Sequence, residues 1–172
     1  MRHQHQEKEV VLSTIRVLAK AVKSTRNLDT QVSSLLTATS SLPLSILDSW
    51  ERQIRWELAN ASNAAPWPWR LKDHPEPVLT WLDLCSGDGF QRERALHRLT
   101  GAAPNCFFLA LAVRRLNDWV PQVRAAARDN LPAIAQASLP EHGVDVLCAT
   151  LPYWHSWGRV EEADRLVLLV FT

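Results

Sequence analysis

The stretch 78-VLTWLDLCSGDGFQRERALHRL-99 decides the fold class, because its first part fits either a strand before a glycine loop or a helix before a second helix. The residues that follow favour helix. Asp88 can cap a helix over FQRERALHRL, and Gly101 can end it. The next apolar run, 106-CFFLALAV-113, is rich in Leu and Ala and poor in the β-branched residues typical of strands. The sequence therefore predicts helices on both sides of the glycines.

Spacing divides the side chains of the helix after Asp88 into two faces. Its apolar residues are expected to face inward and its arginines outward, toward solvent. The inward set is Phe90, Ala95, Leu96 and Leu99, and the outward set is Arg92, Arg94 and Arg98. This assignment leaves the three arginines accessible to a ligand.

The rest of the second half has the same helical character, interrupted by short breaks. Helices are predicted over residues 77–85, 88–99, 104–116, 119–137, 140–154 and 159–171. Pro121 falls in the first turn of one of them, where the missing N–H does no harm. Pro132 lies inside the same helix, so a kink or an early end is expected near it.

The first part of the chain predicts three amphipathic helices. The first has apolar residues on one face from Val10 to Val22, and the second begins at Asp29. The third runs from about Leu44 to Ala61, with Ile46, Leu47, Trp50, Ile54 and Leu58 on its buried side. A proline- and tryptophan-rich segment follows. The chain is therefore divided into an N-terminal helical unit (1–64), a connector (65–77) and helical repeats (78–172).

Composition narrows the class of protein. The 172 residues are 47% hydrophobic, which favours a folded chain, and a net charge of +1 gives no global attraction to nucleic acid or membrane. The apolar runs are too short to cross a bilayer. Cys85, Cys106 and Cys148 are widely spaced in apolar surroundings, which predicts buried thiols in the cytoplasm. No His/Cys cluster has metal-ligand spacing, so no metal or cofactor is expected.

The unit 107-FFLALAVRRLNDWVPQVRAAARDNLPAIA-135 resembles a HEAT repeat. It has an apolar helix, a turn with Asp118, then Pro121, and Arg124 on the second helix. In HEAT-like proteins the matching Asp and Arg often tie neighbouring turns together. The resemblance is clearest over residues 88–137, and it implies an all-α fold: a right-handed array of antiparallel helix pairs, the HEAT-like α-α superhelix.

An alternative resemblance depends on a strand at VLTWLDL. With a strand there, Asp83, Gly87 and Gly89 are similar to the glycine loop of Rossmann-fold methyltransferases, which implies that they contact S-adenosylmethionine. The stretch 144-VDVLCATLPYW-154 is similar to a later motif of that family. The acid expected to hold the ribose hydroxyls is absent, however, and an arginine at Arg114 or Arg115 cannot accept those hydrogen bonds.

Arginines and tryptophans supply the candidate binding residues. Seven arginines lie within 37 residues that contain few acids: Arg92, Arg94, Arg98, Arg114, Arg115, Arg124 and Arg128. In a helix-pair array several of them can line one face and bind phosphates, although a solvated, ion-paired face is the ordinary expectation. Trp119 with Asp118, or Trp81 with Asp83, resembles the groove residues of HEAT-like DNA glycosylases. Trp154 and Trp157 form an aromatic cluster, expected to pack between helices or to bind a partner.

These observations favour a non-catalytic scaffold that uses HEAT-like helical faces to hold a protein partner. The second interpretation is nucleic-acid binding through the arginine face, with or without base excision, and the third is the methyltransferase. The apolar final stretch, 164-DRLVLLVFT-172, predicts self-association, contact with a partner, or a longer chain. The identity of the partner, the oligomeric state and the functional face do not follow from the sequence.

Overall fold

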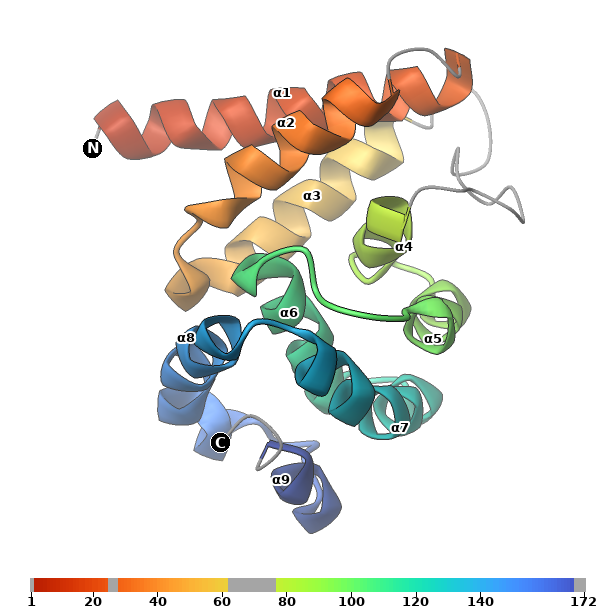
Figure 1. Ribbon diagram of the computed structural model, residues 1–172, viewed down its shortest axis with the longest axis vertical. Coiled ribbons are helices and arrows are strands. Elements are labelled where there is room, and N and C mark those ends of the chain that lie inside the picture. Colours follow the sequence, from red (N-terminus) through yellow and green to blue (C-terminus); the bar gives the residue numbers. More distant parts are fainter. Residues whose placement is uncertain (1, 25–27, 62–76, 169–172) are drawn as a thin grey trace.

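The stretch that decides the fold class is helical on both sides of its glycines. In the computed structural model (Figure 1), α4 spans Pro77–Asp83 and α5 spans Gly89–Arg98. The structure describes residues 2–24, 28–61 and 77–168, and within these ranges the chain forms helices and turns without any strand. The all-α prediction is therefore confirmed, and the strand that the methyltransferase interpretation requires is a helix.

The N-terminal helices pack on one another. Helix α1 (Arg2–Ser24) contacts both α2 (Leu28–Ser40) and α3 (Leu47–Ala61). Their buried apolar side chains include Val11, Ile15, Leu18, Ala19, Leu35, Trp50, Ile54 and Leu58. Ile46 was predicted to be buried and is exposed, because it lies in a separate 3-10 turn, η1 (Leu44–Ile46), before α3 begins.

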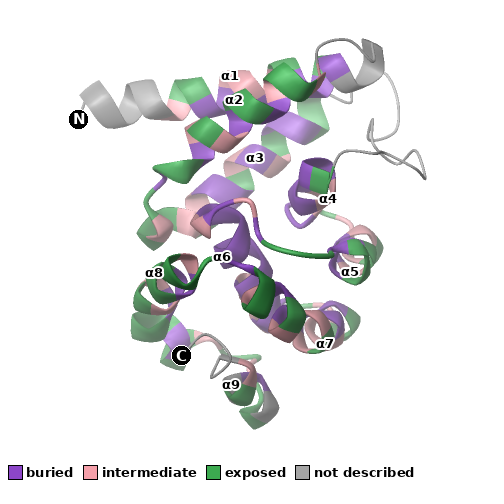
Figure 2. Cartoon of the chain, viewed as in Figure 1, coloured by how far each residue is buried: buried purple, intermediate pink, exposed green. Residues whose placement is uncertain are grey.

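Helix α6 (Cys106–Arg114) forms the centre of the molecule. It contacts α2, α3, α7 (Pro121–Ala137) and α8 (Pro140–Thr150), and Figure 2 shows it buried along most of its length. Its residues from Phe107 to Val113 are all buried, which explains why the run is apolar on every side. The rings of Trp81 and Phe107 meet Phe108 edge-on, with centroids 6.2 and 5.6 Å away.

Two of the side-chain orientations predicted for α5 are wrong. Asp88 caps the helix as predicted, since its carboxylate accepts a hydrogen bond from the Phe90 N–H at 3.0 Å. The inward face is, however, formed by Arg92, Ala95 and Leu96, and Arg92 is only 1% exposed. Phe90, predicted to face inward, is 81% exposed. Arg92 points inward because a carboxylate from another turn binds its guanidinium.

Gly89 opens α5 where that helix approaches the start of α7. A Cβ atom at Gly89 would lie 2.8 Å from Cγ2 of Val120, which is closer than van der Waals contact allows. The predicted turn at Asn117–Trp119 is present, and the helix predicted from residue 119 begins at Pro121. The glycine in this stretch therefore serves close helix packing.

The C-terminal part follows the predicted helices with shorter ends. Helix α7 continues through Pro132 to Ala137, so the early end expected at this proline does not occur. Helix α8 stops at Thr150 and is followed by the 3-10 turn η3 (Leu151–Ser156) and by α9 (Glu162–Leu168), which packs on α7. No described helix is both long enough and apolar enough to span a bilayer.

Some sequence predictions fall at the limits of the described residues. The proposed connector (65–77) lies outside them except for Pro77, and so do residues 169–172 of the apolar end. The prediction of buried thiols holds for Cys85 but is wrong for Cys148, which is exposed on the outer side of α8, one turn after exposed Val144. Burial raises the pKa of the Cys85 thiol, which keeps it protonated.

Candidate binding cleft

An arginine-lined cleft of about 400 Å³ lies between α3, α5, the turn at Asp118 and the segment after η3. We call it the cationic cleft. Its lining residues are Asp48, Glu51, Arg52, Arg55, Arg92, Arg114, Arg115, Asn117, Asp118, Trp119 and Arg159. Six arginines face three carboxylates, so the lining carries an excess of three positive charges.

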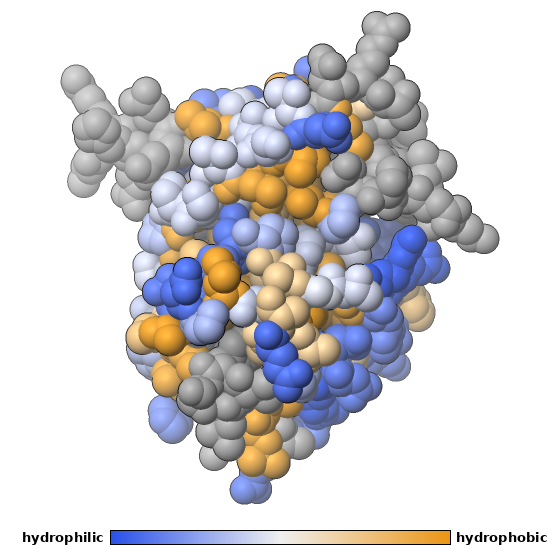
Figure 3. Space-filling view, in the orientation of Figure 1, coloured by the Kyte–Doolittle hydropathy of each residue, from blue (hydrophilic) through white to orange (hydrophobic). Residues whose placement is uncertain are grey.

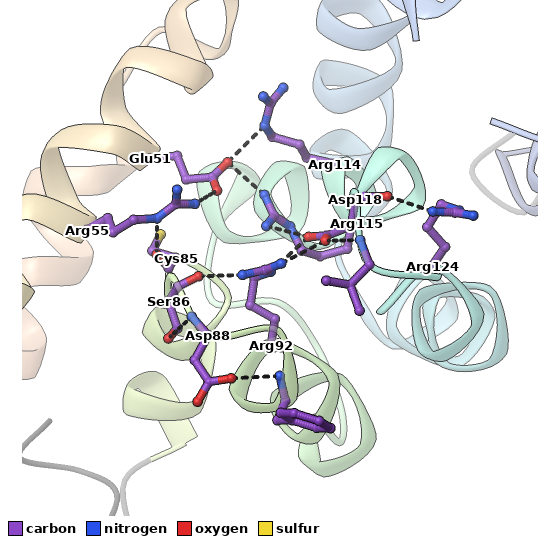
Figure 4. A network of polar contacts seen from close by, with 12 residues as sticks. Glu51, Arg55, Cys85, Ser86, Asp88, Arg92, Arg114, Arg115, Asp118 and Arg124 are labelled. Carbon is purple, nitrogen blue, oxygen red and sulfur yellow. Dashed lines mark hydrogen bonds and ion pairs between the residues drawn. The ribbon is translucent and has the colours of Figure 1, made fainter. Parts of the chain in front are cut away.

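Asp118 anchors the inner wall of the cationic cleft (Figure 4). Arg92 binds it with two hydrogen bonds, Nε to Oδ2 and Nη2 to Oδ1, both 2.8 Å long. Arg115 donates to Oδ2 at 3.0 Å, and the Val120 N–H donates to Oδ1 at 3.0 Å. Arg92 also donates to the Ser86 carbonyl at 2.8 Å. Because every lone-pair direction has a donor and both arginines are buried, the carboxylate fixes the turn against α5.

Glu51 on α3 is the second buried carboxylate of the network. Its Oε2 accepts from Arg115 Nη2 at 2.7 Å and from Arg114 Nε at 2.8 Å. Its Oε1 accepts from Arg55 Nη2 at 2.5 Å, and Arg55 Nε donates to the Cys85 carbonyl at 2.9 Å. Glu51 therefore connects α3 to the end of α6 and to the glycine turn after α4 (Figure 4).

Both buried carboxylates stay ionised in the folded protein. Burial alone would raise the pKa of Glu51, but the charges of Arg115, Arg114 and Arg55 outweigh it and hold that pKa below its ordinary value. Burial likewise opposes ionisation of Asp118, and the hydrogen bond from Arg92 with the charge of Arg115 lowers its pKa. The network is therefore fully charged at neutral pH.

Acid is expected to destabilise the protein through this network. Because the folded pKa values of Glu51 and Asp118 are depressed, their contribution to stability is present above the ordinary carboxyl pKa and is lost as the pH falls through the folded values. The free energy of unfolding, measured with urea from neutral pH to below about pH 4, should fall steeply. The Asp118→Asn variant should show a shallower fall. Equal slopes in the two proteins would contradict this assignment.

Two arginines of the cleft are accessible to a ligand and have no partner among the described residues. Arg52 on α3 and Arg159 after η3 are exposed, and neither guanidinium has a hydrogen bond or ion pair to the described part of the chain. The Arg159 N–H donates to the Asn117 side chain at 3.2 Å, which holds that segment at the cleft. Trp119 is 66% exposed, and the Cζ atom of Arg92 lies over its ring, 5.7 Å from the ring centroid. Arg52 and Arg159 therefore line the same cleft as an exposed aromatic ring, and their positive charges suit an anionic ligand.

The seven predicted arginines do not share one face. Arg92, Arg114 and Arg115 line the cleft in ion pairs, and Arg128 pairs with Glu161 and Asp164 near α9. Arg124 donates to the Asp118 carbonyl at 2.9 Å. Arg94 and Arg98 are exposed on α5, where Figure 3 shows hydrophilic residues gathered over α5 and α7.

The predicted tryptophans lie at two places. Trp119 stands at the cationic cleft, whereas Trp154 and Trp157 pack against each other with ring centroids 5.1 Å apart. Trp154 is buried, and Trp157 is half-buried at a second hollow near η3. In this aromatic cluster, Trp154 is therefore a packing residue, and part of Trp157 remains accessible to a ligand.

The sequence analysis missed Asp48, Glu51, Arg52, Arg55 and Arg159. A signal for one of them was present. Glu51 lies four residues after Leu47 and three before Ile54, on the apolar face of its helix, and a buried acid there requires cationic partners. Nothing in the local sequence marks the other four.

Comparison of the chain with models of known protein families, with curated proteins and with solved structures gives no match. Among the described residues, no group of His, Cys, Asp and Glu side chains is placed to hold a metal ion.

Proposed function

We propose that this chain is a non-catalytic binding protein, a HEAT-like helical scaffold that holds a partner protein by an acidic segment in the cationic cleft. The excess of arginine over carboxylate in the cleft lining carries this proposal. Carboxylates are natural ligands for free guanidinium groups, because the planar N–H fork matches two carboxylate oxygens. Arg52 and Arg159 are the groups to which the partner binds.

The proposal includes a right-handed array of antiparallel helix pairs. Consecutive helices α4 and α5 pack together, as do α6 and α7, and α5 also packs on α7. The hydrogen bond from Arg124 to the Asp118 carbonyl supports a repeat-like turn between α6 and α7, with Pro121 at the helix start.

An acidic protein segment suits the cleft better than a nucleic-acid backbone. Binding a duplex needs a row of accessible cations along the surface. Four of the seven arginines predicted to form that row, Arg92, Arg114, Arg115 and Arg128, are already held in ion pairs. Within the described part of the chain, Arg52 and Arg159 instead lie together at a concave site, which favours a short anionic segment.

Fluorescence anisotropy with labelled short peptides tests the proposal. A glutamate-rich peptide should bind the wild-type protein, and the double variant Arg52→Glu/Arg159→Glu should bind it about tenfold more weakly or worse. Arg94→Glu, an exposed arginine outside the cleft, is the matched control and should bind as the wild type does. Failure of the acidic peptide to bind would contradict the proposal. So would salt-dependent binding of duplex DNA that the double variant loses.

A further inference from the structure

A second hollow adjoins the cationic cleft and differs from it in character. This groove, about 480 Å³, lies between η1, the start of α3, α6, the end of α8 and η3. We call it the apolar groove. Its apolar and aromatic lining includes Leu44, Ile46, Leu47, Ala110, Tyr153 and Trp157, and Ser45, Ser49, Thr150 and Ser156 add hydroxyl groups to the wall. Asp48, Arg52, Arg114 and Asn117 line both hollows, so the two adjoin.

Large apolar side chains stand at the groove without being covered. Ile46 and Tyr153 are exposed although each is beside a concave surface, and Trp157 presents the accessible edge of its aromatic pair. Exposed apolar groups around a hollow with a polar rim are typical of a site that receives an apolar side chain. The polar rim here is the arginine side of the cationic cleft.

Arg52 marks the junction of the two hollows. Its guanidinium is free within the described part of the chain, and it reaches the cationic cleft on one side and the apolar groove on the other. A ligand that fills only the cationic cleft leaves the apolar lining in water. A ligand with an anionic group next to an apolar group can contact both linings. Charge complementarity at Arg52 then determines which end of the ligand lies in the cationic cleft.

We propose that the two hollows together bind one linear peptide segment in which a carboxylate side chain is followed or preceded closely by a large apolar side chain. The carboxylate binds at Arg52 and Arg159, and the apolar side chain enters the groove beside Ile46 and Tyr153. An extended chain advances about 3.3 Å per residue and places alternate side chains on the same face, so side chains two residues apart can reach adjoining hollows. This inference rests on the proposed function and names the chemistry of its ligand.

Selection from a random-peptide display library tests the inference, with the 172-residue wild-type chain as bait. The selected peptides should share Asp or Glu within a few residues of Leu, Phe or Trp. A selected peptide is then synthesised, labelled and titrated against variants by fluorescence anisotropy. Arg52→Glu and Ile46→Glu should each weaken binding about tenfold or more. Tyr153→Ala should weaken it by a smaller factor.

Two matched controls separate site effects from general ones. Arg94→Glu reverses an exposed arginine on α5, and Val144→Glu places a charge at an exposed aliphatic residue of α8, both outside the two hollows. Both should bind the selected peptide as the wild type does. Circular dichroism of each variant verifies that the fold is retained, and Tyr153→Ala keeps the test valid if Ile46→Glu does not fold.

The outcomes distinguish this inference from the proposed function. Acidic peptides without an apolar preference, weakened by Arg52→Glu but unaffected by Ile46→Glu and Tyr153→Ala, overturn the two-hollow site and leave the proposed function standing. Absence of any acidic preference overturns both. Concentration-dependent dimerisation in sedimentation velocity that Ile46→Glu abolishes places a second copy in the groove and overturns the peptide ligand.

Discussion

Replacing Asp118 by asparagine is expected to lower the free energy of unfolding by about 3–5 kcal/mol, because it leaves buried guanidinium charges without their carboxylate. Asp118 accepts two hydrogen bonds from Arg92 and one from Arg115, and both arginines are buried. An asparagine amide has one oxygen, and its N–H₂ would face arginine donors. Urea denaturation followed by circular dichroism measures the loss, which is large beside a typical domain stability of about 5–15 kcal/mol.

The same substitution at an exposed acid shows whether the loss of stability comes from breaking the buried network or only from removing a negative charge. Asp129 lies exposed on α7 with no ion pair to the described residues, so Asp129→Asn should change the stability by no more than about 0.5 kcal/mol. If Asp118→Asn proved as stable as Asp129→Asn, the buried network would not hold the turn between α6 and α7 as described.

Truncating Phe108 to alanine is the second change with a large expected effect, a loss of about 3–5 kcal/mol in the free energy of unfolding. Phe108 is fully buried in α6, and its ring meets those of Trp81 and Phe107 edge-on. Helices pack around α6 from several sides, so the cavity left by the ring cannot collapse easily. The midpoint of urea unfolding should fall without a change in the slope.

Phe90→Ala is the control, since Phe90 belongs to the same residue type and is 81% exposed. Its expected effect is within about 0.5 kcal/mol of zero. Comparable losses for the two variants would show that the assigned orientation of α5 or the central place of α6 is wrong.

The helices could be predicted because their signals are local. Asp88 caps α5 and Pro121 opens α7, and both were visible as residue types at the right distance from an apolar pattern. The apolar run of α6 was predicted as a helix from its Leu and Ala content, and its burial follows from having no polar side. Those features fix element type without knowledge of the neighbours.

The orientation of α5 could not be predicted in the same way. Periodicity assigns an arginine to the outside, because a buried charge is costly unless it is paired. Arg92 faces inward since Asp118, 26 residues further along the chain, supplies both oxygens to its guanidinium. With Arg92 inside, Phe90 two residues earlier lies on the opposite side of the helix.

The cleft itself depends on long-range packing. Glu51 and Arg115 are 64 residues apart, and the Arg159 N–H meets the Asn117 side chain across 42 residues. Such pairs are brought together by the contacts of α3 with α6 and by the return of the chain after η3. The arginine content of the second half was visible in the sequence, but which arginines stay free was decided by these contacts.

Arginine side-chain ¹H–¹⁵N NMR spectra during titration with the glutamate-rich peptide identify the guanidinium groups that bind an acidic segment. The Nε–Hε signals of Arg52 and Arg159 should shift and saturate together, because neither guanidinium has a hydrogen bond or ion pair to the described residues. The signals of Arg92 and Arg115 should move little, since carboxylates already hold both groups. Shifts confined to Arg94 and Arg98 on α5, or no shift at Arg52, would show that the acidic segment does not bind in the cationic cleft.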